Sequence, residues 1–166
     1  MKITKLIVFL MTIQCLVSCT TLKPATSIKN GKIENYKYAY ISPTNSLTSS
    51  YGTTINGQYY SSSKSVNPSD VISGILSKKG LVILPYQKTE LTEETLLVNY
   101  GESGRRNTGL GGYTIEVTIQ LISAKTNELI CSCTAEGQGS TEADDIRQAI
   151  TRCMSNILST ETNEKK

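Results

Sequence analysis

The stretch that decides the fold is residues 112–137, GYTIEVTIQLISAKTNELICSCTAEG. Apolar and polar side chains alternate along residues 112–123, as expected of a β-strand whose successive side chains point to opposite faces of a sheet. Residues 123–128 have the composition of a turn, and residues 129–137 form a returning strand. The side chains expected on the inward face are Tyr113, Ile115, Val117, Ile119 and Leu121, followed by Leu129, Cys131, Cys133 and Ala135. This stretch therefore predicts an antiparallel hairpin with one buried face.

Two helices are predicted around this hairpin. The first begins at Asn67-Pro68, where Asn67 suits the N-cap and Pro68 the first helical position, and it ends at Gly80. The second begins at the capping-box pattern Thr141 to Asp144. Its buried stripe is expected to comprise Ile146, Ala149, Ile150, Cys153, Met154 and Ile157.

The remaining segments complete a single domain. Shorter strands are predicted at residues 36–41, 81–84 and 95–100, with one helical turn over residues 90–94. Residues 44–66 are rich in Ser, Thr and Tyr and predict a polar, exposed loop or a hairpin turning at Asn56-Gly57. We expect an α+β domain over residues 35–160, with a mainly antiparallel sheet of about four to five strands and two helices packed on one face. Residues 19–34 are expected to form a tether, and residues 161–166 a disordered tail.

The first 18 residues have the composition of a signal peptide. Lys2 and Lys5 precede an apolar run, and about 12 apolar-rich residues give a helix of roughly 18 Å, too short for a hydrocarbon core of ~30 Å. The segment ends in Leu16-Val17-Ser18-Cys19, which resembles the lipobox of bacterial lipoproteins. The resemblance implies cleavage between Ser18 and Cys19 and acylation of Cys19. A secretory signal peptide with an incidental cysteine is the alternative.

The lipobox resemblance also implies a location. Two or three acyl chains hold a protein stably on a bilayer, whereas one chain holds it only marginally, so the membrane is the first expected partner. In some Gram-negative groups an acidic cluster after the acylated cysteine directs lipoproteins to the cell surface, and no such cluster follows Cys19. We therefore expect the domain to face the periplasm, and we expect the anchor to lie in the outer membrane.

The composition excludes several classes of chemistry. The chain has no His, which excludes Ser-His-Asp and Cys-His catalysis and nearly every catalytic zinc site. The net charge is +3, and loss of Lys2 and Lys5 with the signal leaves about +1, which is not the charge of a nucleic-acid-binding protein. We expect no nucleic-acid partner, no cofactor and no metal.

Three cysteines remain if Cys19 is lipidated and the signal is removed. Cys131 and Cys133 lie on the same face of one strand and cannot easily bond each other, whereas Cys153 lies on the buried stripe of the last helix. In an oxidising compartment we expect a Cys133–Cys153 disulfide by slight preference, with Cys131–Cys153 as the other pairing. Three buried thiols are nearly as well supported, and a three-cysteine metal site is weaker because no fourth ligand is placed.

Two other patterns could indicate a site. Ser61-Ser62-Ser63-Lys64 matches the S-x-x-K pattern of penicillin-binding enzymes, but the companion motifs are absent. Glu142, Asp144 and Asp145 could hold a cation, but their position at a helix start explains them as partners of the helix dipole.

A glycine-rich stretch, residues 101–112, predicts a flexible hairpin tip. It carries Arg105 and Arg106, which could form a basic contact loop for carboxylates or phosphates, including lipid headgroups. Solvated surface arginines are the plainer interpretation.

The stretch from Leu81 to Ile157 resembles small bacterial envelope lipoproteins of unknown function. The shared outline includes a strand ending in Tyr100-Gly101, a hairpin turning at residues 124–127 and a C-terminal helix. The resemblance implies no catalytic residues. We expect a non-enzymatic, membrane-anchored module that binds another envelope component, such as an envelope protein. The alternatives are a hydrolase with a Ser/Lys or carboxylate site, and a lipoprotein that oligomerises through an open sheet edge.

Overall fold

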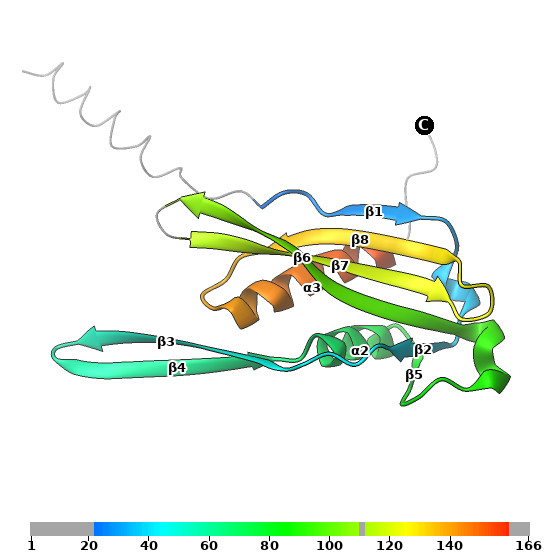
Figure 1. Cartoon of the computed structure of the whole chain (residues 1–166), viewed down its shortest axis with the longest axis horizontal. Helices are drawn as coiled ribbons and strands as arrows, with labels where there is room; N and C mark the ends of the chain where they lie inside the picture. The colour runs from blue at the N-terminus through cyan, green and yellow to red at the C-terminus, as the bar shows by residue number, and fades with distance from the viewer. Residues whose placement is uncertain (1–21, 110–111, 160–166) are drawn as a thin grey trace, which may run out of the picture.

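A computed structural model describes residues 22–109 and 112–159 and has the predicted α+β class (Figure 1). The strands are β1 (Thr26–Lys29), β2 (Tyr38–Ile41), β3 (Leu47–Ile55), β4 (Gln58–Val66), β5 (Val82–Leu84), β6 (Thr95–Gly109), β7 (Gly112–Ser123) and β8 (Leu129–Gly137). The helices are α2 (Pro68–Lys78) and α3 (Glu142–Leu158), with short 3-10 helices η2 (Ile33–Asn35) and η3 (Thr89–Glu94). The predicted signal peptide, including Ser18 and Cys19, and the predicted tail at 161–166 lie outside the described residues.

Six strands form one mixed sheet in the order β1-β8-β7-β6-β2-β5, and β3 and β4 form a separate ribbon. The pairs β1–β8, β8–β7 and β7–β6 are antiparallel, whereas β2 runs parallel to both β5 and β6. The sheet is thus larger than the predicted four to five strands, and it is antiparallel in only part of its width. Parallel neighbours need a crossover connection, and α2 lies in the connection between β2 and β5.

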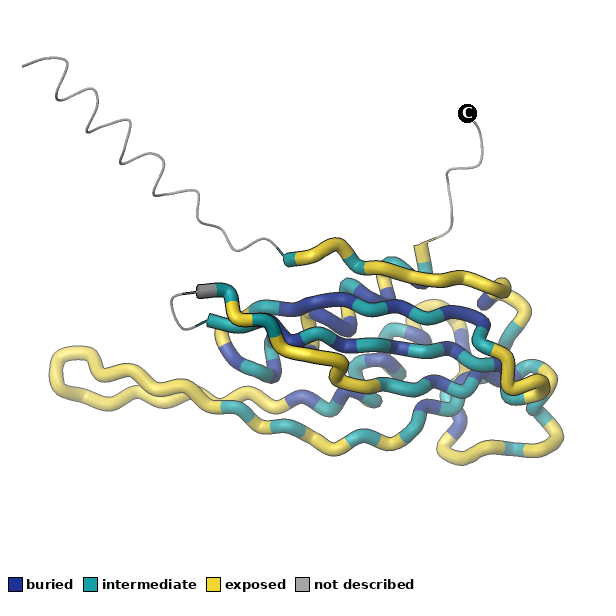
Figure 2. The backbone as a smooth tube through the Cα atoms, turned by 45° about the horizontal axis from the view of Figure 1, so that its top comes forward, coloured by how far each residue is buried: buried dark blue, intermediate teal, exposed yellow. Residues whose placement is uncertain are grey.

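The core lies between the sheet and the two helices. α3 packs on β7 and β8, and α2 packs on β2, β5 and α3, so both helices cover one face. Figure 2 shows the buried segments concentrated in these elements. The predicted stripe of α3 is confirmed, because its six residues are all nearly inaccessible to solvent, as are Ile115, Val117, Ile119 and Leu121 of β7. Burying each such aliphatic side chain contributes about 1.5–3 kcal/mol.

β1 departs from the predicted tether. Its residues Thr26–Lys29 pair with Thr134 to Cys131 of β8, and Ile33 in η2 is buried. All four β1 side chains are exposed, so none of them needs to be apolar. The segment therefore lacks the alternating apolar pattern that would have predicted a strand. The folded region therefore begins well before residue 35.

β6 departs from the predicted flexible tip. The strand continues from Thr95 to Gly109, and its second half pairs with β7, with a register shift between Glu102 and Gly104. Glycine lowers strand propensity, which is why residues 101–109 do not predict a strand by composition. Pairing along β7 supplies the backbone hydrogen bonds that keep this segment extended.

Candidate functional site

The β3–β4 ribbon projects from the domain as an arm, which we define as residues 50–63 (Figures 1 and 2). The strands pair antiparallel from Leu47–Val66 to Ile55–Gln58. Asn56 and Gly57 form the turn with positive φ angles of 51° and 78°, as a tight hairpin requires. Every residue of the arm is exposed to solvent. The polar segment is thus a long hairpin that packs on the domain only at its base.

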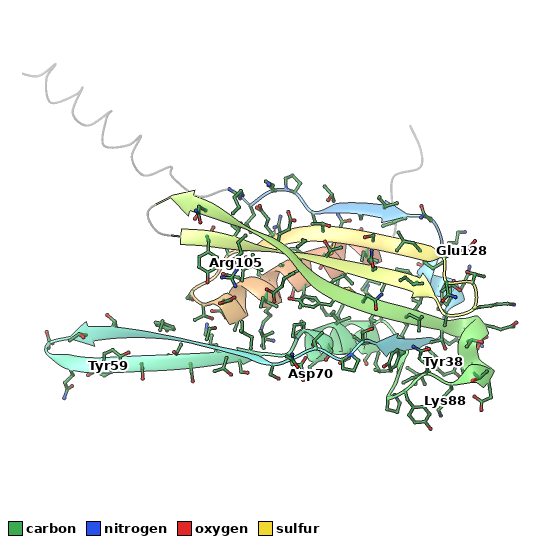
Figure 3. The ribbon with its side chains drawn as sticks, viewed as in Figure 1. Tyr38, Tyr59, Asp70, Lys88, Arg105 and Glu128 are labelled. Atoms are coloured by element: carbon green, nitrogen blue, oxygen red, sulfur yellow. A yellow bond between two sulfur atoms is a disulfide. The ribbon has the colours of Figure 1, made fainter. Side chains whose placement is uncertain are left out.

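The arm carries large apolar side chains and no charge. Tyr51, Ile55, Tyr59 and Tyr60 are 47–72% exposed, and residues 50–63 include no Asp, Glu, Lys or Arg. The strand register places Tyr51, Ile55 and Tyr60 on one face of the ribbon and Tyr59 on the other (Figure 3 labels Tyr59). An isolated two-stranded ribbon is only marginally stable in water, so these exposed rings indicate a contact surface.

The base of the arm is fixed to the start of α3. Ser49 Oγ accepts a hydrogen bond from the Ala143 amide at 3.0 Å, which satisfies one of the unpaired amides of the first helical turn. The Lys64 ammonium pairs with Asp144 at 2.7 Å. The direction in which the arm projects is therefore set by α3.

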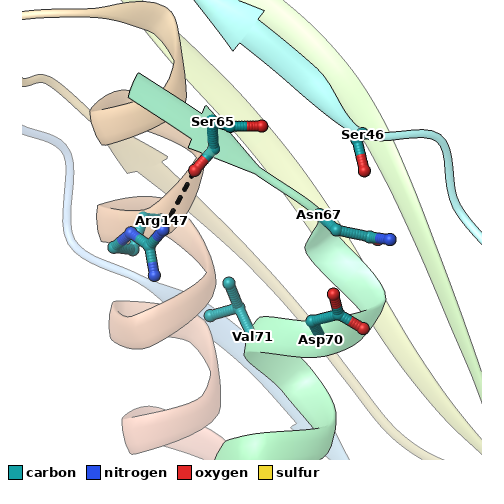
Figure 4. A pocket seen from close by; sticks show the side chains of 6 residues that line it. All are labelled: Ser46, Ser65, Asn67, Asp70, Val71 and Arg147. Carbon is teal, nitrogen blue, oxygen red and sulfur yellow. Dashed lines mark hydrogen bonds between the residues drawn. The ribbon is translucent and has the colours of Figure 1, made fainter. Parts of the chain in front are cut away.

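A polar groove of about 330 Å³ lies beside the arm base (Figure 4). Its lining residues are Ser46, Ser65, Asn67, Asp70, Val71 and Arg147. Asn67 is the N-cap of α2, because its side-chain oxygen accepts from the Ser69 amide at 3.2 Å. Arg147 of α3 donates to the Ser65 carbonyl at 3.3 Å. The groove thus offers charged walls from two helices but brings no nucleophile and base together.

The S-x-x-K pattern does not form a converging pair. Ser61 and Lys64 both lie on β4, and residues three apart in a strand point to opposite faces. Ser61 is opposite Gly52 in the arm, whereas Lys64 pairs with Asp144 at the base.

The acidic residues at the start of α3 have partners within the domain. Thr141 Oγ1 accepts from the Asp144 amide at 3.3 Å and caps the helix. Glu142 pairs with Arg105, Asp144 with Lys64, and Asp145 accepts from the Gly139 amide. No group of His, Cys, Asp and Glu in the part of the chain that the structure describes is arranged to hold a metal ion.

Arg105 and Arg106 lie in strand β6 and not in the predicted flexible loop. Arg105 pairs with Glu142 and lies over the Tyr113 ring, 5.3 Å from its centre. Arg106 donates from Nε and a terminal nitrogen to the two carboxylate oxygens of Glu136, at 2.8 and 2.7 Å. Both guanidinium groups therefore hold the domain together.

Glu136 is the buried centre of a cluster that we call the Glu136 clamp, formed by Lys23, Arg106, Glu136 and Arg152. Only 2% of the Glu136 side chain is exposed, and its carboxylate accepts from the Lys23 amide at 3.0 Å. Arg152 of α3 donates to the Lys23 carbonyl at 2.6 Å. The clamp thus holds the incoming chain against β6, β8 and α3.

The Glu136 clamp predicts a loss of stability in acid. The hydrogen bonds from Arg106 lower the pKa of Glu136 from 4.5 to about 2. A lowered folded-state pKa gives stability that is complete above the unfolded value of 4.5 and is lost as the pH falls towards about 2. Arg106 is one-third exposed, and solvent screening weakens its interaction with Glu136. We therefore expect ionised Glu136 to contribute about 2 kcal/mol to the free energy of unfolding, less than its full pKa shift implies.

Urea unfolding of wild type and Glu136→Gln, from about pH 7 to about pH 3, checks this expectation. The glutamine variant should lose less stability than wild type over this range, since position 136 no longer titrates. Equal losses in the two proteins would assign the acid sensitivity to other carboxylates.

Cys133 of β8 and Cys153 of α3 form a disulfide, with their Cα atoms 5.6 Å apart. Cys131 is a free, buried thiol. The structure thus has the preferred of the two predicted pairings, and it does not have the Cys131–Cys153 pairing or three free thiols. The bond joins the sheet to the helix that covers it.

The comparisons with known proteins give a structural similarity alone. No protein-family model matches the chain, and no curated protein matches it. Two solved structures of the PelC dodecamer from Paraburkholderia phytofirmans, one of them a point variant, are similar to this chain. TM-scores are 0.45 and 0.44, with 17% sequence identity in each case. The matches cover 81% of this chain and 93% and 94% of those chains. Similarity at this level assigns no family and no function.

Within residues 22–109 and 112–159, no helix combines the length and apolar character needed to span a bilayer.

Proposed function

We propose that the chain is a lipoprotein of the bacterial cell envelope, cleaved before Cys19 and acylated on that residue. In this proposal it is held in the outer membrane, faces the periplasm and acts as a non-enzymatic binding or accessory module. The arm is its contact element. The lipobox Leu16-Val17-Ser18-Cys19 supports the anchor.

The observation that carries the binding role is the exposure of the arm. Four large apolar side chains are displayed on residues 50–63 without any charged neighbour in the arm. Tyrosine rings bury a large area on binding and lose little conformational entropy, which favours them at contact surfaces. The base is fixed by Ser49 and Lys64, so the rings are presented in a set direction.

Two observations weigh against the hydrolase alternative. The chain lacks His, and Ser61 and Lys64 point to opposite faces of one strand. The groove at the arm base contributes Asp70 and Arg147, which can bind a polar group but do not activate a nucleophile as placed.

The oligomerising alternative is supported by the edge strand β1. Its four residues are exposed, and Ile28 is 61% exposed at an open edge of the sheet. Such an edge can pair with a strand of another copy.

We expect Cys19→Ala to abolish palmitate labelling and to release the protein from membranes, because the thiol is the site of acylation in this proposal. Metabolic labelling followed by membrane fractionation measures both effects. Cys131→Ala is the matched control, because it removes a buried cysteine that has no part in anchoring. Palmitate retained by Cys19→Ala would refute the anchor.

Chymotrypsin, which cleaves after Tyr, tests the contact role in the same membranes. Tyr51, Tyr59 and Tyr60 should be protected in native membranes and cleaved after detergent extraction. Equal cleavage in both conditions would remove the support for the arm as a contact element.

A further inference from the structure

The arm tip lies at one end of the long axis, and the incoming chain meets the domain nearer the middle of that axis. Figures 1 and 2 show the arm projecting beyond the rest of the described chain, with the end of β6 between the arm tip and the start of the described chain along the axis. The turn between β7 and β8, together with η3, lies at the other end. The strand register agrees with this placement, since Glu136, which binds Lys23, is opposite Glu116 of β7, four residues inside the Gly109–Gly112 pair that ends the β6–β7 ladder.

The Glu136 clamp limits how far the domain can lie from the anchor. The Lys23 amide is bound by Glu136 and the Lys23 carbonyl by Arg152. Four residue steps separate Cys19 from Lys23, and a fully extended chain spans at most about 14 Å over that length. Lipid on Cys19 would therefore hold the Glu136 clamp close to the membrane surface.

The arm differs in charge from the opposite end of the molecule. The arm has no charged residue between Ser50 and Ser63. The charged side chains at the opposite end include Lys37, Lys88, Glu90, Glu93, Glu94, Lys125 and Glu128. Bringing uncharged tyrosines to a bilayer surface avoids the desolvation of charge, whereas the opposite end is suited to water.

We propose that the arm is a second membrane contact, with residues 51–60 lying in the interfacial region of the bilayer that holds the Cys19 lipid. This inference rests on the anchor of the proposed function and names the bilayer as the partner of the arm. Tyrosine is enriched at membrane interfaces, where its ring meets acyl chains and its hydroxyl stays hydrated. The arm is a two-stranded ribbon, and its unpaired outer backbone groups keep it at headgroup depth, because they would be costly in hydrocarbon.

Such a contact would act with the lipid and the clamp to fix the orientation of the domain. The lipid alone leaves the domain free to tilt about its attachment point. β3 spans nine residues, or about 30 Å, and displaces the arm tip from the clamp. Two separated contacts would hold the face covered by the helices and the open face of the sheet at defined angles to the membrane.

Tryptophan fluorescence provides the test, because the native chain has no Trp. Tyr59→Trp places a single indole on the arm, and Tyr86→Trp is the matched control, since Tyr86 is 61% exposed and follows β5 at a distance from the arm. Each full-length lipidated protein is reconstituted into phosphatidylcholine vesicles with or without brominated acyl chains. We expect brominated lipid to reduce the emission of Tyr59→Trp about twofold, with a shift to shorter wavelength, and to leave Tyr86→Trp unchanged.

The outcomes separate this inference from the anchor. If both variants float with the vesicles and neither is quenched, the bilayer contact is overturned and the anchor stands. If neither variant carries palmitate or floats, both proposals are overturned. If Tyr59→Trp is shielded from iodide only in native membranes, and brominated lipid has no effect, the partner of the arm is a protein and the bilayer contact is overturned.

Discussion

Gly137→Ala is expected to lower the free energy of unfolding by about 3 kcal/mol or more, because it forces β8 and α3 apart. A Cβ atom at position 137 would lie 1.9 Å from the Asp145 carbonyl oxygen and 2.7 Å from the Ala149 nitrogen. Both atoms belong to the α3 backbone and cannot rotate away. The helix would have to shift, and that shift would open the buried contacts of Ile146 and Ile150. Urea unfolding monitored by circular dichroism measures the loss.

Gly101→Ala is the matched control in the same sheet. A Cβ atom at Gly101 meets nothing within 4 Å, so the expected change is within about 0.5 kcal/mol. Neither glycine has a positive φ, so backbone conformation does not distinguish the two positions. Similar stability in the two variants would show that the close approach of β8 to α3 is not required for folding.

The sequence predicted the elements whose pattern reflects burial on one side. The alternation in β7 and the helical stripe of α3 are local patterns, and the apolar face of each element is buried in the structure. β1 has no such pattern, since all of its side chains are exposed. The order of the strands in the sheet could not be predicted from local patterns either. The parallel pairing of β2 with β5 and β6 joins segments that are far apart in the chain.

The arm and the Glu136 clamp could be predicted only in part, because local patterns do not show how distant segments are placed relative to each other. Asn56-Gly57 indicates a hairpin, but no periodic signal shows that it projects from the domain instead of packing on it. Glu136 lies at an outward position of β8, where a carboxylate is ordinarily solvated. Its partners Arg106 and Lys23 are 30 and 113 residues away in the chain, and only the fold brings them together.

Replacing Cys133 and Cys153 together by Ala is expected to lower the free energy of unfolding by about 3 kcal/mol. The disulfide closes a loop with a sequence separation of 20 and thereby restricts the unfolded chain. Both side chains are buried between β8 and α3, so loss of their packing adds to the effect. The comparison is made by urea unfolding of the oxidised wild type and the double variant.

Reductant and thiol counting separate the covalent bond from the packing of the side chains. A reducing agent should destabilise wild type and Cys131→Ala by similar amounts and leave the double variant unchanged, because Cys131 is outside the bond. Denatured, oxidised mature protein should show one reactive thiol, Cys131, since Cys19 is acylated in the proposed anchor. Three reactive thiols would mean that the bond does not form in the envelope, and the cysteines would then stabilise the interface between β8 and α3 by packing alone.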